Sequence, residues 1–421
     1  MTTTSALTRA AELYLELHRD PELSGAEQRT AARFADWLTG TGYQVVQGVG
    51  GHGVVAALRN GPGPVVLLRA ELDALPVEER TGLPYASTAT ARTADGRTVP
   101  VMHACGHDVH LACAAGAAAA LARARDRWRG TVLVVGQPAE ETLRGAAAML
   151  GDGLYQRFEP PQVVLAQHTA PLPAGLVAHA FGPVTAGSRT LRLVIHGRGG
   201  HAAAPHLAVD PVVAAAAVVL RLQAVVAQET SPAEQVVVTV GSLEAGSGGN
   251  VIPDRATLTV TVRGFSEQVL DRVGAAVVRV ARGEAAASGC PREPSVEELS
   301  RSGVNLPDPA LTEAVRAAHQ NAFGTARVAQ WPPALATEDF PLFGEAGVDL
   351  HGVRGIRTAY WMLGMVGARQ WAQAPGSGPA EKMAALPPNH SPEFRPSVRL
   401  TLQTGITALV SAATAALGPG D

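Results

Sequence analysis

The 421-residue sequence is poor in cysteine, in aromatic residues and in excess charge of either sign. It has only three cysteines, an odd number, which argues against a disulfide framework and favours a reducing compartment. The net charge of −3 gives no basic surface field, so we expect no nucleic-acid partner. Aromatic residues make up only 4% of the chain, and the core must therefore be built mainly from aliphatic side chains.

The sequence also lacks the patterns of a secretory signal and of a membrane span. The N-terminal segment, MTTTSALTRAAELYLELHRD, has no basic region followed by an apolar one and is typical of an amphipathic helix. Residues 111–121 are apolar but too short to cross a bilayer. We therefore expect a cytoplasmic protein that does not bind membranes.

Short apolar runs alternate with longer helical patterns in the first part of the chain. Residues 65–72, 131–137 and 161–168 carry Val and Leu on both faces, which is typical of strands buried inside a sheet. Residues 111–128 predict a helix between the first two strands, with Asp108 as its N-cap. This alternation indicates an α/β sheet covered by helices.

The pattern changes near Pro183. From there the sequence predicts a strand, a helix, two strands, a second helix and a last strand, the order of a ferredoxin-like α+β unit. These elements are expected at 188–200, 209–228, 234–243, 256–265, 266–289 and near 291–299.

The length of the chain exceeds what a single hydrophobic core supports, so two domains are expected. The α/β pattern resumes near Asn305, and residues 364–388, rich in Gly, Pro and Ala, predict a long loop. The smaller domain is therefore inserted into the larger one. The expected ranges are 1–183 and 298–421 for the larger domain and 184–297 for the inserted domain.

The segment His103-Ala-Cys-Gly-His-Asp-Val-His110 places one thiol and three of the thirteen imidazoles within eight residues. The glycine between Cys105 and His107 lets the backbone fold tightly, so that both side chains can reach one metal ion. The alternative is a surface turn with solvated histidines and a buried cysteine. Because cysteine is scarce in this chain, the crowding favours a metal site.

Further donors follow the expected strands. Asp73 comes after the first strand, Glu140 and Glu141 come after the second, His168 ends the third, and His390 lies in the loop PPNHSPEF. Ligands of open α/β sheets gather beyond the carboxyl ends of the strands, so these side chains should meet there. Taken singly, each has a structural alternative: a satisfied histidine, a loop histidine or a capping aspartate.

The adjacent pair Glu140-Glu141 suits a division of labour. Neighbouring side chains of an extended segment point in different directions, so one carboxylate can bind metal while the other takes a proton from water. The alternative is an acid-rich helix N-terminus, which is common.

Nine segments, in order along nearly the whole chain, resemble the metal-dependent aminoacylase/carboxypeptidase family, and closely its hippurate hydrolase and auxin-conjugate amidohydrolase subgroup. The segments are LHRDPELSGAEQRT (17–30), LRAELDALPVEE (68–79), MHACGHDVHLA (102–112), GQPAEE (136–141), QHTAPLPAG (167–175), GRGGHAAAPHLAVDP (197–211), GNVIPDRATLTVTVRGF (249–265), EDFPLF (338–343) and NHSPEF (389–394).

The resemblance implies a role for each matching residue. It implies that Cys105 is a thiolate shared by two metal ions, that Glu140 is the general base and later the acid, and that Asp73 orients a ligand histidine. The implied ligands of the two-metal site are Cys105, His107, Glu141, His168 and His390.

Three residues of the inserted domain also match. The resemblance implies that His201 reaches the active site of a neighbouring subunit and polarises the scissile carbonyl. It implies that Asn250 and Arg263 bind the free carboxylate of the substrate, a task that suits the planar fork of arginine.

The resemblance thus implies an α/β, mixed-sheet metallohydrolase domain with an inserted ferredoxin-like lid or dimerisation domain. It implies a homodimer or higher homo-oligomer with two divalent ions per subunit, Zn, Mn, Co or Ni, that cleaves N-acyl amino acids or dipeptide-like conjugates. An alternative is a dedicated deacylase or dipeptidase of a specialised-metabolite pathway. Outside enzymes, the alternatives are a metal-dependent binding protein without turnover and a redox-sensing homo-oligomer.

The sequence departs from the subgroup at several places near the expected site. Glu71 stands where the subgroup usually has Asp, and residues 142–144 replace small, glycine-rich residues after Glu141. The loop before His390 is longer than usual, and Arg395 follows the last segment where an acid is common. None of these changes removes a predicted ligand or the base, but all can reshape the substrate pocket.

Overall fold

The computed structural model describes residues 3–93 and 95–420 and divides into two units. Unit 1 contains the chain up to Val184, Leu306–Pro332 and the chain from Asp339 onward, and unit 2 contains Thr185–Asn305 and Pro333–Glu338. Unit 2 thus extends beyond residue 297, where we expected it to end, because the last strand of its sheet runs to Ser302.

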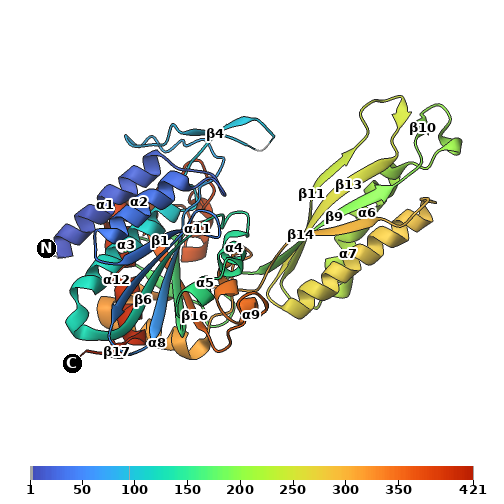
Figure 1. The fold of residues 1–421 in the computed structure, drawn as a ribbon. Helices are drawn as coiled ribbons and strands as arrows, with labels where there is room; N and C mark the ends of the chain where they lie inside the picture. The colour runs from blue at the N-terminus through green and yellow to red at the C-terminus, as the bar shows by residue number, and fades with distance from the viewer. Residues whose placement is uncertain (1–2, 94, 421) are drawn as a thin grey trace. The chain divides into compact units, whose positions relative to one another are not determined.

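Nine of the described strands of unit 1 form one sheet in the order β1-β2-β6-β3-β7-β16-β8-β15, with β17 beside β6 (Figure 1). The short strands β4 (Thr90–Arg92) and β5 (Thr98–Pro100) form a separate pair. Strands β3, β6, β7 and β16 are parallel, so their carboxyl ends share one edge of the sheet. The bounds are β1 (Gln44–Val49), β2 (Gly53–Asn60), β3 (Val65–Glu71), β6 (Trp128–Gln137), β7 (Val163–Pro173), β8 (Val177–His179), β15 (Val328–Gln330), β16 (Arg357–Val366) and β17 (Gly418–Pro419).

Helices cover both faces of this sheet because its central strands are apolar on both sides. In β3, Val66 and Leu68 belong to one buried cluster, whereas Val65 and Leu67 belong to the other. The first face is covered by α1 (Thr3–Arg19), α2 (Gln28–Thr39), α3 (His107–Arg123), α8 (Pro309–Phe323) and α12 (Val398–Ala416), and the second by α4 (Gly145–Gly151), α5 (Leu154–Arg157) and the segment around Phe340.

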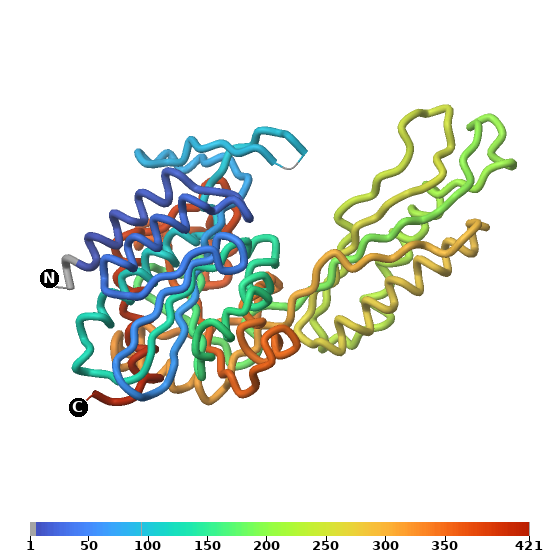
Figure 2. The backbone as a smooth tube through the Cα atoms, viewed as in Figure 1, coloured from blue at the N-terminus to red at the C-terminus, as the bar shows by residue number. Residues whose placement is uncertain are grey.

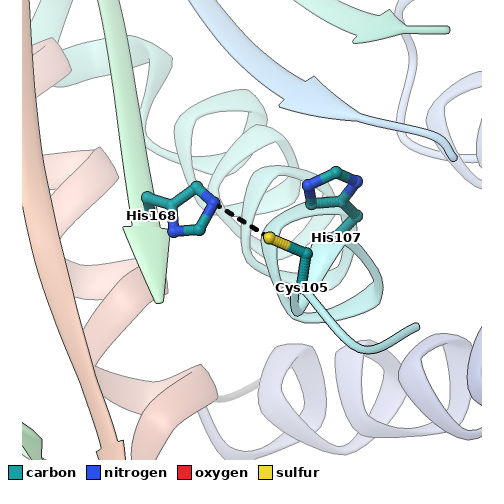
Figure 3. A group of neighbouring side chains, drawn as sticks. All are labelled: Cys105, His107 and His168. Atoms are coloured by element: carbon teal, nitrogen blue, oxygen red, sulfur yellow. Dashed lines mark hydrogen bonds between the residues drawn. The ribbon is translucent and has the colours of Figure 1, made fainter. Parts of the chain in front are cut away.

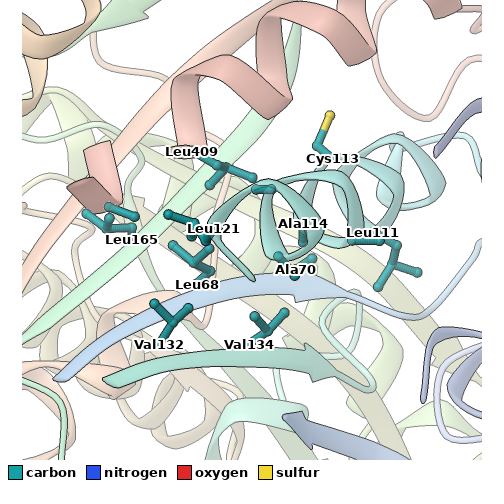
Figure 4. Packing of buried hydrophobic residues seen from close by; sticks show 14 of the residues in the cluster. Leu68, Ala70, Leu111, Cys113, Ala114, Leu121, Val132, Val134, Leu165 and Leu409 are labelled. Carbon is teal, nitrogen blue, oxygen red and sulfur yellow. The ribbon is translucent and has the colours of Figure 1, made fainter. Parts of the chain in front are cut away.

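Helix α3 packs directly on β3 and β6 (Figure 4). Leu111, Ala114 and Leu121 of this helix lie over strand residues of the same buried cluster, such as Val132 and Val134. Small alanine side chains let the helix approach the sheet closely, and burial of each larger aliphatic side chain contributes roughly 1.5–3 kcal/mol. The segment before α3 is therefore held firmly at the edge where β3 and β6 end.

Three local expectations were wrong. Helix α3 begins at His107, and its N-cap is Gly106 with φ of 84°, so Asp108 lies in the first turn and is not the cap. Strand β7 continues to Pro173, so His168 lies inside the strand. The expected loop 364–388 contains the end of β16 and two helices, α10 (Ala368–Gln373) and α11 (Pro379–Ala385).

Unit 2 has the ferredoxin-like order of elements that the sequence predicted (Figures 1 and 2). Its four-stranded antiparallel sheet has the order β11-β13-β9-β14, and α6 and α7 pack against it. The bounds are β9 (Gly187–His196), α6 (Pro211–Glu229), β11 (Val236–Ala245), β13 (Arg255–Gly264), α7 (Glu267–Ala287) and β14 (Ser295–Ser302), with the short strands β10 (Gly200–His201) and β12 (Val251–Ile252) forming a separate pair.

Among the described helices, only α6 is long and apolar enough to span a membrane by length and composition. One third of its apolar window is buried, and Ala214, Val218 and Leu222 belong to the core of unit 2. The apolar character of α6 is therefore partly explained by its packing on the sheet of this unit.

Candidate metal centre

The carboxyl edge of the unit 1 sheet brings together segments that are far apart in sequence. Glu71 pairs with Gln137 at the parallel ends of β3 and β6, and Leu68 pairs with Leu165 of β7. Three residues further along β7, His168 therefore lies level with the end of β3. These donors are neighbours because the carboxyl ends of the parallel strands share one edge of the sheet.

The structure brings all five predicted metal ligands into two groups. Within each group, the donor atoms all lie within 4.8 Å of one another. Both groups contain Cys105. The first group is Cys105, His107 and His168, and the second is Cys105, Glu141 and His390.

Direct distances show how close these donors are. In the first group, Cys105 Sγ lies 3.4 Å from His168 Nε2 (Figure 3). In the second, His390 Nε2 lies 3.4 Å from Glu141 Oε1. His107 Nε2 lies 3.8 Å from the same Glu141 oxygen and joins the two groups.

The donor atoms fit a transition metal. His107 Nε2 and Glu141 Oε1 are buried and have no hydrogen-bond partner in residues 3–93 and 95–420. A buried polar atom without a partner is costly, and such atoms beside a thiol are explained by an ion that they bind. Thiolate, imidazole and carboxylate are the ligand types that zinc and its neighbours prefer.

Asp73 connects two of the predicted ligands. Its main-chain oxygen lies 2.9 Å from His107 Nδ1, its carboxylate lies 3.2 Å from the same nitrogen, and the carboxylate accepts the Glu141 main-chain N–H at 2.9 Å. Ser24 Oγ donates to Asp73 at 2.7 Å. Burial alone would lower the pKa of His107, but Asp73 and the nearby acids raise it to about 10. These contacts point His107 Nε2 toward the other donors.

Glu140 lies beside the predicted ligands. Its side chain is buried, and Oε2 lies 3.8 Å from His107 Nε2. The turn that carries it is tight: Leu143 N donates to Glu140 O at 2.7 Å, and Ala139 and Leu143 both have positive φ, at 51° and 55°. Residues 142–144, which depart from the family pattern, contain no glycine, and Gly145 follows them at the end of the turn.

Glu27, to which the sequence pattern assigned no role, holds the same turn. Glu27 is fully buried, and its Oε1 accepts from Gly25 N at 2.7 Å and from Ala139 N at 2.8 Å. Its position inside the matching segment 17–30 was the available signal.

Glu71, where the subgroup usually has Asp, is also fully buried. It contacts His110 Nδ1 at 2.7 Å and pairs with Arg69. His110 Nε2 in turn accepts the Thr169 main-chain N–H at 2.9 Å, so both of its nitrogens are used. His110 therefore ties α3 to β3 and β7 through its two ring nitrogens.

The remaining predicted residues belong to unit 2 and lie in two different places. His201 pairs with Val251 in the β10–β12 pair, and Asn250 O accepts Ala202 N at 3.0 Å, so His201 and Asn250 are neighbours. Arg263 lies near the other end of β13 and donates to Leu335 O at 2.8 Å. The eight-residue step from the start of β13 to Arg263 corresponds to roughly 26 Å.

Comparison with known proteins places the chain in a family. Residues 67–375 match the profile of peptidase family M20/M25/M40. N-acetylcysteine deacetylase of Bacillus subtilis (strain 168) is 34% identical over 345 residues, which cover 80% of this chain and 86% of that protein. Hippurate hydrolase of Campylobacter jejuni is 32% identical over 333 residues, which cover 78% of this chain and 83% of that protein.

Solved structures agree along the whole chain. A protein of methicillin-resistant Staphylococcus aureus superposes with a TM-score of 0.82 at 30% identity, covering 99% of this chain and 98% of that one. A dinuclear metal-binding peptidase of Bacillus subtilis superposes with a TM-score of 0.73 at 26% identity, covering 97% of this chain and 98% of that one. The chain therefore belongs to peptidase family M20/M25/M40.

Proposed function

We propose that the protein is a metal-dependent amidohydrolase that cleaves the amide bond of an N-acyl amino acid and releases the free amino acid. The observation that carries this proposal is the pair of donor groups that share Cys105, with Glu140 beside them. Relatives named N-acetylcysteine deacetylase and hippurate hydrolase support the class of reaction.

Cys105, His107, Glu141, His168 and His390 would hold two divalent ions, with Cys105 contributing to both positions. When bound, the ions would act as Lewis acids that polarise the scissile carbonyl and make a water molecule more acidic. Zinc, manganese, cobalt and nickel all suit this mixture of ligands, because geometry and availability decide among them.

Glu140 moves the proton. Its carboxylate lies next to His107 but is not needed to complete either donor group around Cys105. It takes a proton from the attacking water and later delivers it to the departing nitrogen, so that the amine leaves as a neutral group. The hydrogen bond from Ala139 N to the Glu27 carboxylate holds the turn that carries Glu140, and so keeps the Glu140 carboxylate in place during both steps.

The substrate carboxylate would need residues from two copies of the chain. Asn250 and Arg263 lie too far apart within one unit 2 to contact the same carboxylate group. If both bind it, one of them belongs to a second subunit. His201, the neighbour of Asn250, would then act together with Asn250 in the active site of the other subunit, where it would polarise the scissile carbonyl.

Removal and return of metal test the proposed reaction. We expect exhaustive chelation to abolish hydrolysis of N-acetyl and N-benzoyl amino acids and a divalent ion to restore it. Full activity in metal-free enzyme would contradict the proposal. A panel of acyl groups, amino acids and dipeptides, assayed with each of the four metals, separates a general aminoacylase from a dedicated deacylase or dipeptidase that accepts one conjugate.

Mixing two inactive variants tests the contribution of a second subunit. Glu140→Gln and His201→Ala each remove one function, and a mixed dimer restores one site in which both residues are intact. We expect the mixture to regain a measurable fraction of wild-type activity after subunit exchange. An inactive mixture whose exchange is verified by mass would show that His201 acts within its own subunit.

A further inference from the structure

Backbone strain in the described chain gathers around the candidate metal centre. Within residues 3–93 and 95–420, the non-glycine residues with positive φ are Ala139, Leu143 and His390. Two flank the Glu140-Glu141 pair, and the third is itself a predicted ligand with φ of 72°. Such a conformation is unfavourable for a residue with a Cβ atom and persists only where the surroundings enforce it.

The residue next to His390 makes the contacts that enforce this conformation. Asn389 Nδ2 donates to Cys105 O at 3.1 Å and lies 3.3 Å from Thr169 O. It also lies 3.8 Å from Cys105 Sγ and 3.4 Å from Thr169 Oγ1. An amide nitrogen carries two hydrogens, and the two main-chain oxygens are its nearest acceptors.

These acceptors belong to segments that carry the other ligands. Thr169 follows His168 directly, and its main-chain oxygen also lies 2.9 Å from His168 Nδ1. Thr169 Oγ1 donates to Cys105 O at 2.9 Å, and His390 N donates to Ala104 O at 2.8 Å. The Cys105 loop, the His168 strand and the His390 turn are therefore joined at the side chain of Asn389.

The packing leaves little room for another arrangement. A Cβ atom at Gly106 would lie 2.5 Å from Thr169 Oγ1 and 3.2 Å from Phe394. The Cys105 loop is thus pressed against the segment that Asn389 also contacts. A small change at residue 389 should therefore shift the ligands relative to one another and should not be absorbed by empty space.

We propose that Asn389 is a positioning residue that fixes the separation of Cys105, His168 and His390, and so sets the affinity of the site for divalent metal. The proposal rests on the metal-dependent function proposed above. A carboxamide suits the position because it donates to two carbonyl oxygens at once. A carboxylate of the same shape would face those oxygens with negative charge.

The test compares Asn389→Asp with a matched change elsewhere in unit 1. Asn60 Nδ2 also donates to two main-chain oxygens, those of Arg125 at 2.7 Å and Trp128 at 2.5 Å. Asn60→Asp therefore removes the same kind of contact at the end of β2, on the edge of the sheet opposite to the metal centre. Each protein is stripped of metal, titrated with Zn²⁺ and separately with Mn²⁺ in chelator buffers, and melted in its metal-free form.

We expect Asn389→Asp to weaken metal binding about tenfold to a hundredfold, the usual effect of losing a residue that orients ligands. We expect Asn60→Asp to leave metal affinity unchanged, and the metal-free melting temperatures of the two variants to be similar. Asn389→Ser, which keeps a short donor, should fall between wild type and Asn389→Asp. At saturating metal, kcat should fall more than KM rises, because ligand geometry changes while substrate contacts remain.

Metal affinity within threefold of wild type in both Asn389 variants would overturn the proposal. If both variants are unfolded without metal while Asn60→Asp folds, Asn389 is a general fold determinant and the proposal is also wrong. Failure of the proposed function gives a different result, because the wild-type protein itself would then bind no metal tightly or hydrolyse amides without it.

Discussion

At the scale of single residues, the proposed tasks of the adjacent acids Glu140 and Glu141 differ because their contacts differ. Glu141 contacts His107 and His390, and its main-chain N–H donates a hydrogen bond to the carboxylate of Asp73. Glu140 belongs to neither donor group around Cys105. The two residues share a turn and a charge, so the proposed division into a metal ligand and a proton carrier rests on the different directions of their side chains.

Replacing each acid by its amide separates the two tasks. Glu140→Gln keeps the shape of the side chain but removes the basic oxygen, so turnover should fall on the order of a hundredfold or more with both metals still bound. Glu141→Gln should instead lose metal, because a neutral amide is a much weaker ligand. Turnover and metal content of the same preparations check both results. Near-native turnover in Glu140→Gln, together with full metal content in Glu141→Gln, would mean that the roles are assigned wrongly.

At the scale of elements, the turn between β6 and α4 places both acids, and Gly145 makes this turn possible. A Cβ atom at Gly145 would lie 1.5 Å from the carbonyl oxygen of Pro138, which no side-chain adjustment can relieve. Gly145 N lies near Ala139 O, so the two ends of the turn meet there. The glycine is required for close approach of the backbone and not for a left-handed conformation.

We therefore expect Gly145→Ala to displace the turn and to lower metal affinity and turnover together, by more than tenfold each. Gly151→Ala is the matched control, because Gly151 ends the same helix α4 and a Cβ atom there meets nothing within 4 Å. That control should retain activity and metal. Metal titration and a thermal melt of both variants provide the measurement, and equal behaviour of the two would show that the close contact at Gly145 does not matter.

The elements also show what the sequence could predict. Apolar runs marked β3, β6 and β7, and their parallel ends predicted that Asp73, Glu140 and His168 would be neighbours. The predicted start of α3 was wrong, because Gly106, in a left-handed conformation, is the N-cap in place of the predicted Asp108. Asn389 and Glu27 lie in the matching segments 389–394 and 17–30, but their contacts join segments that are distant in sequence, so that position did not reveal what they would contact.

At the scale of the whole molecule, unit 1 contains buried histidines that respond to pH in opposite directions. His179 Nε2 and His319 Nδ1 lie 2.9 Å apart, and His319 Nε2 lies 3.1 Å from Ala408 O, so the pair joins β8, α8 and α12. Burial lowers the pKa of His179 to about 3, aided by His319 and Arg316, and burial lowers that of His319 to about 4. Both histidines are therefore neutral in the folded protein at neutral pH.

His18 behaves differently. Burial would lower its pKa, but the carboxylates of Asp108 at 2.7 Å and Glu79 at 3.2 Å raise it to about 9. The stability that His18 contributes is fully present below pH 6.5 and is lost as the pH rises toward 9. The His179–His319 pair contributes in the other window: as the pH falls below 6.5, the unfolded chain binds protons that the folded chain cannot accept, and stability is lost.

His179→Gln tests the acidic window. The new amide can still donate to His319 Nδ1, but one group that titrates on unfolding is gone. Between pH 6.5 and about 4, the free energy of unfolding should therefore fall less steeply with falling pH than in wild type. The difference between the two slopes should be about 1.4 kcal/mol for each pH unit. Denaturant unfolding of metal-free protein at several pH values measures this slope. His206→Gln removes an exposed histidine and should leave the slope unchanged. Parallel curves for wild type and His179→Gln would show that the buried pair does not set the acid stability of the protein.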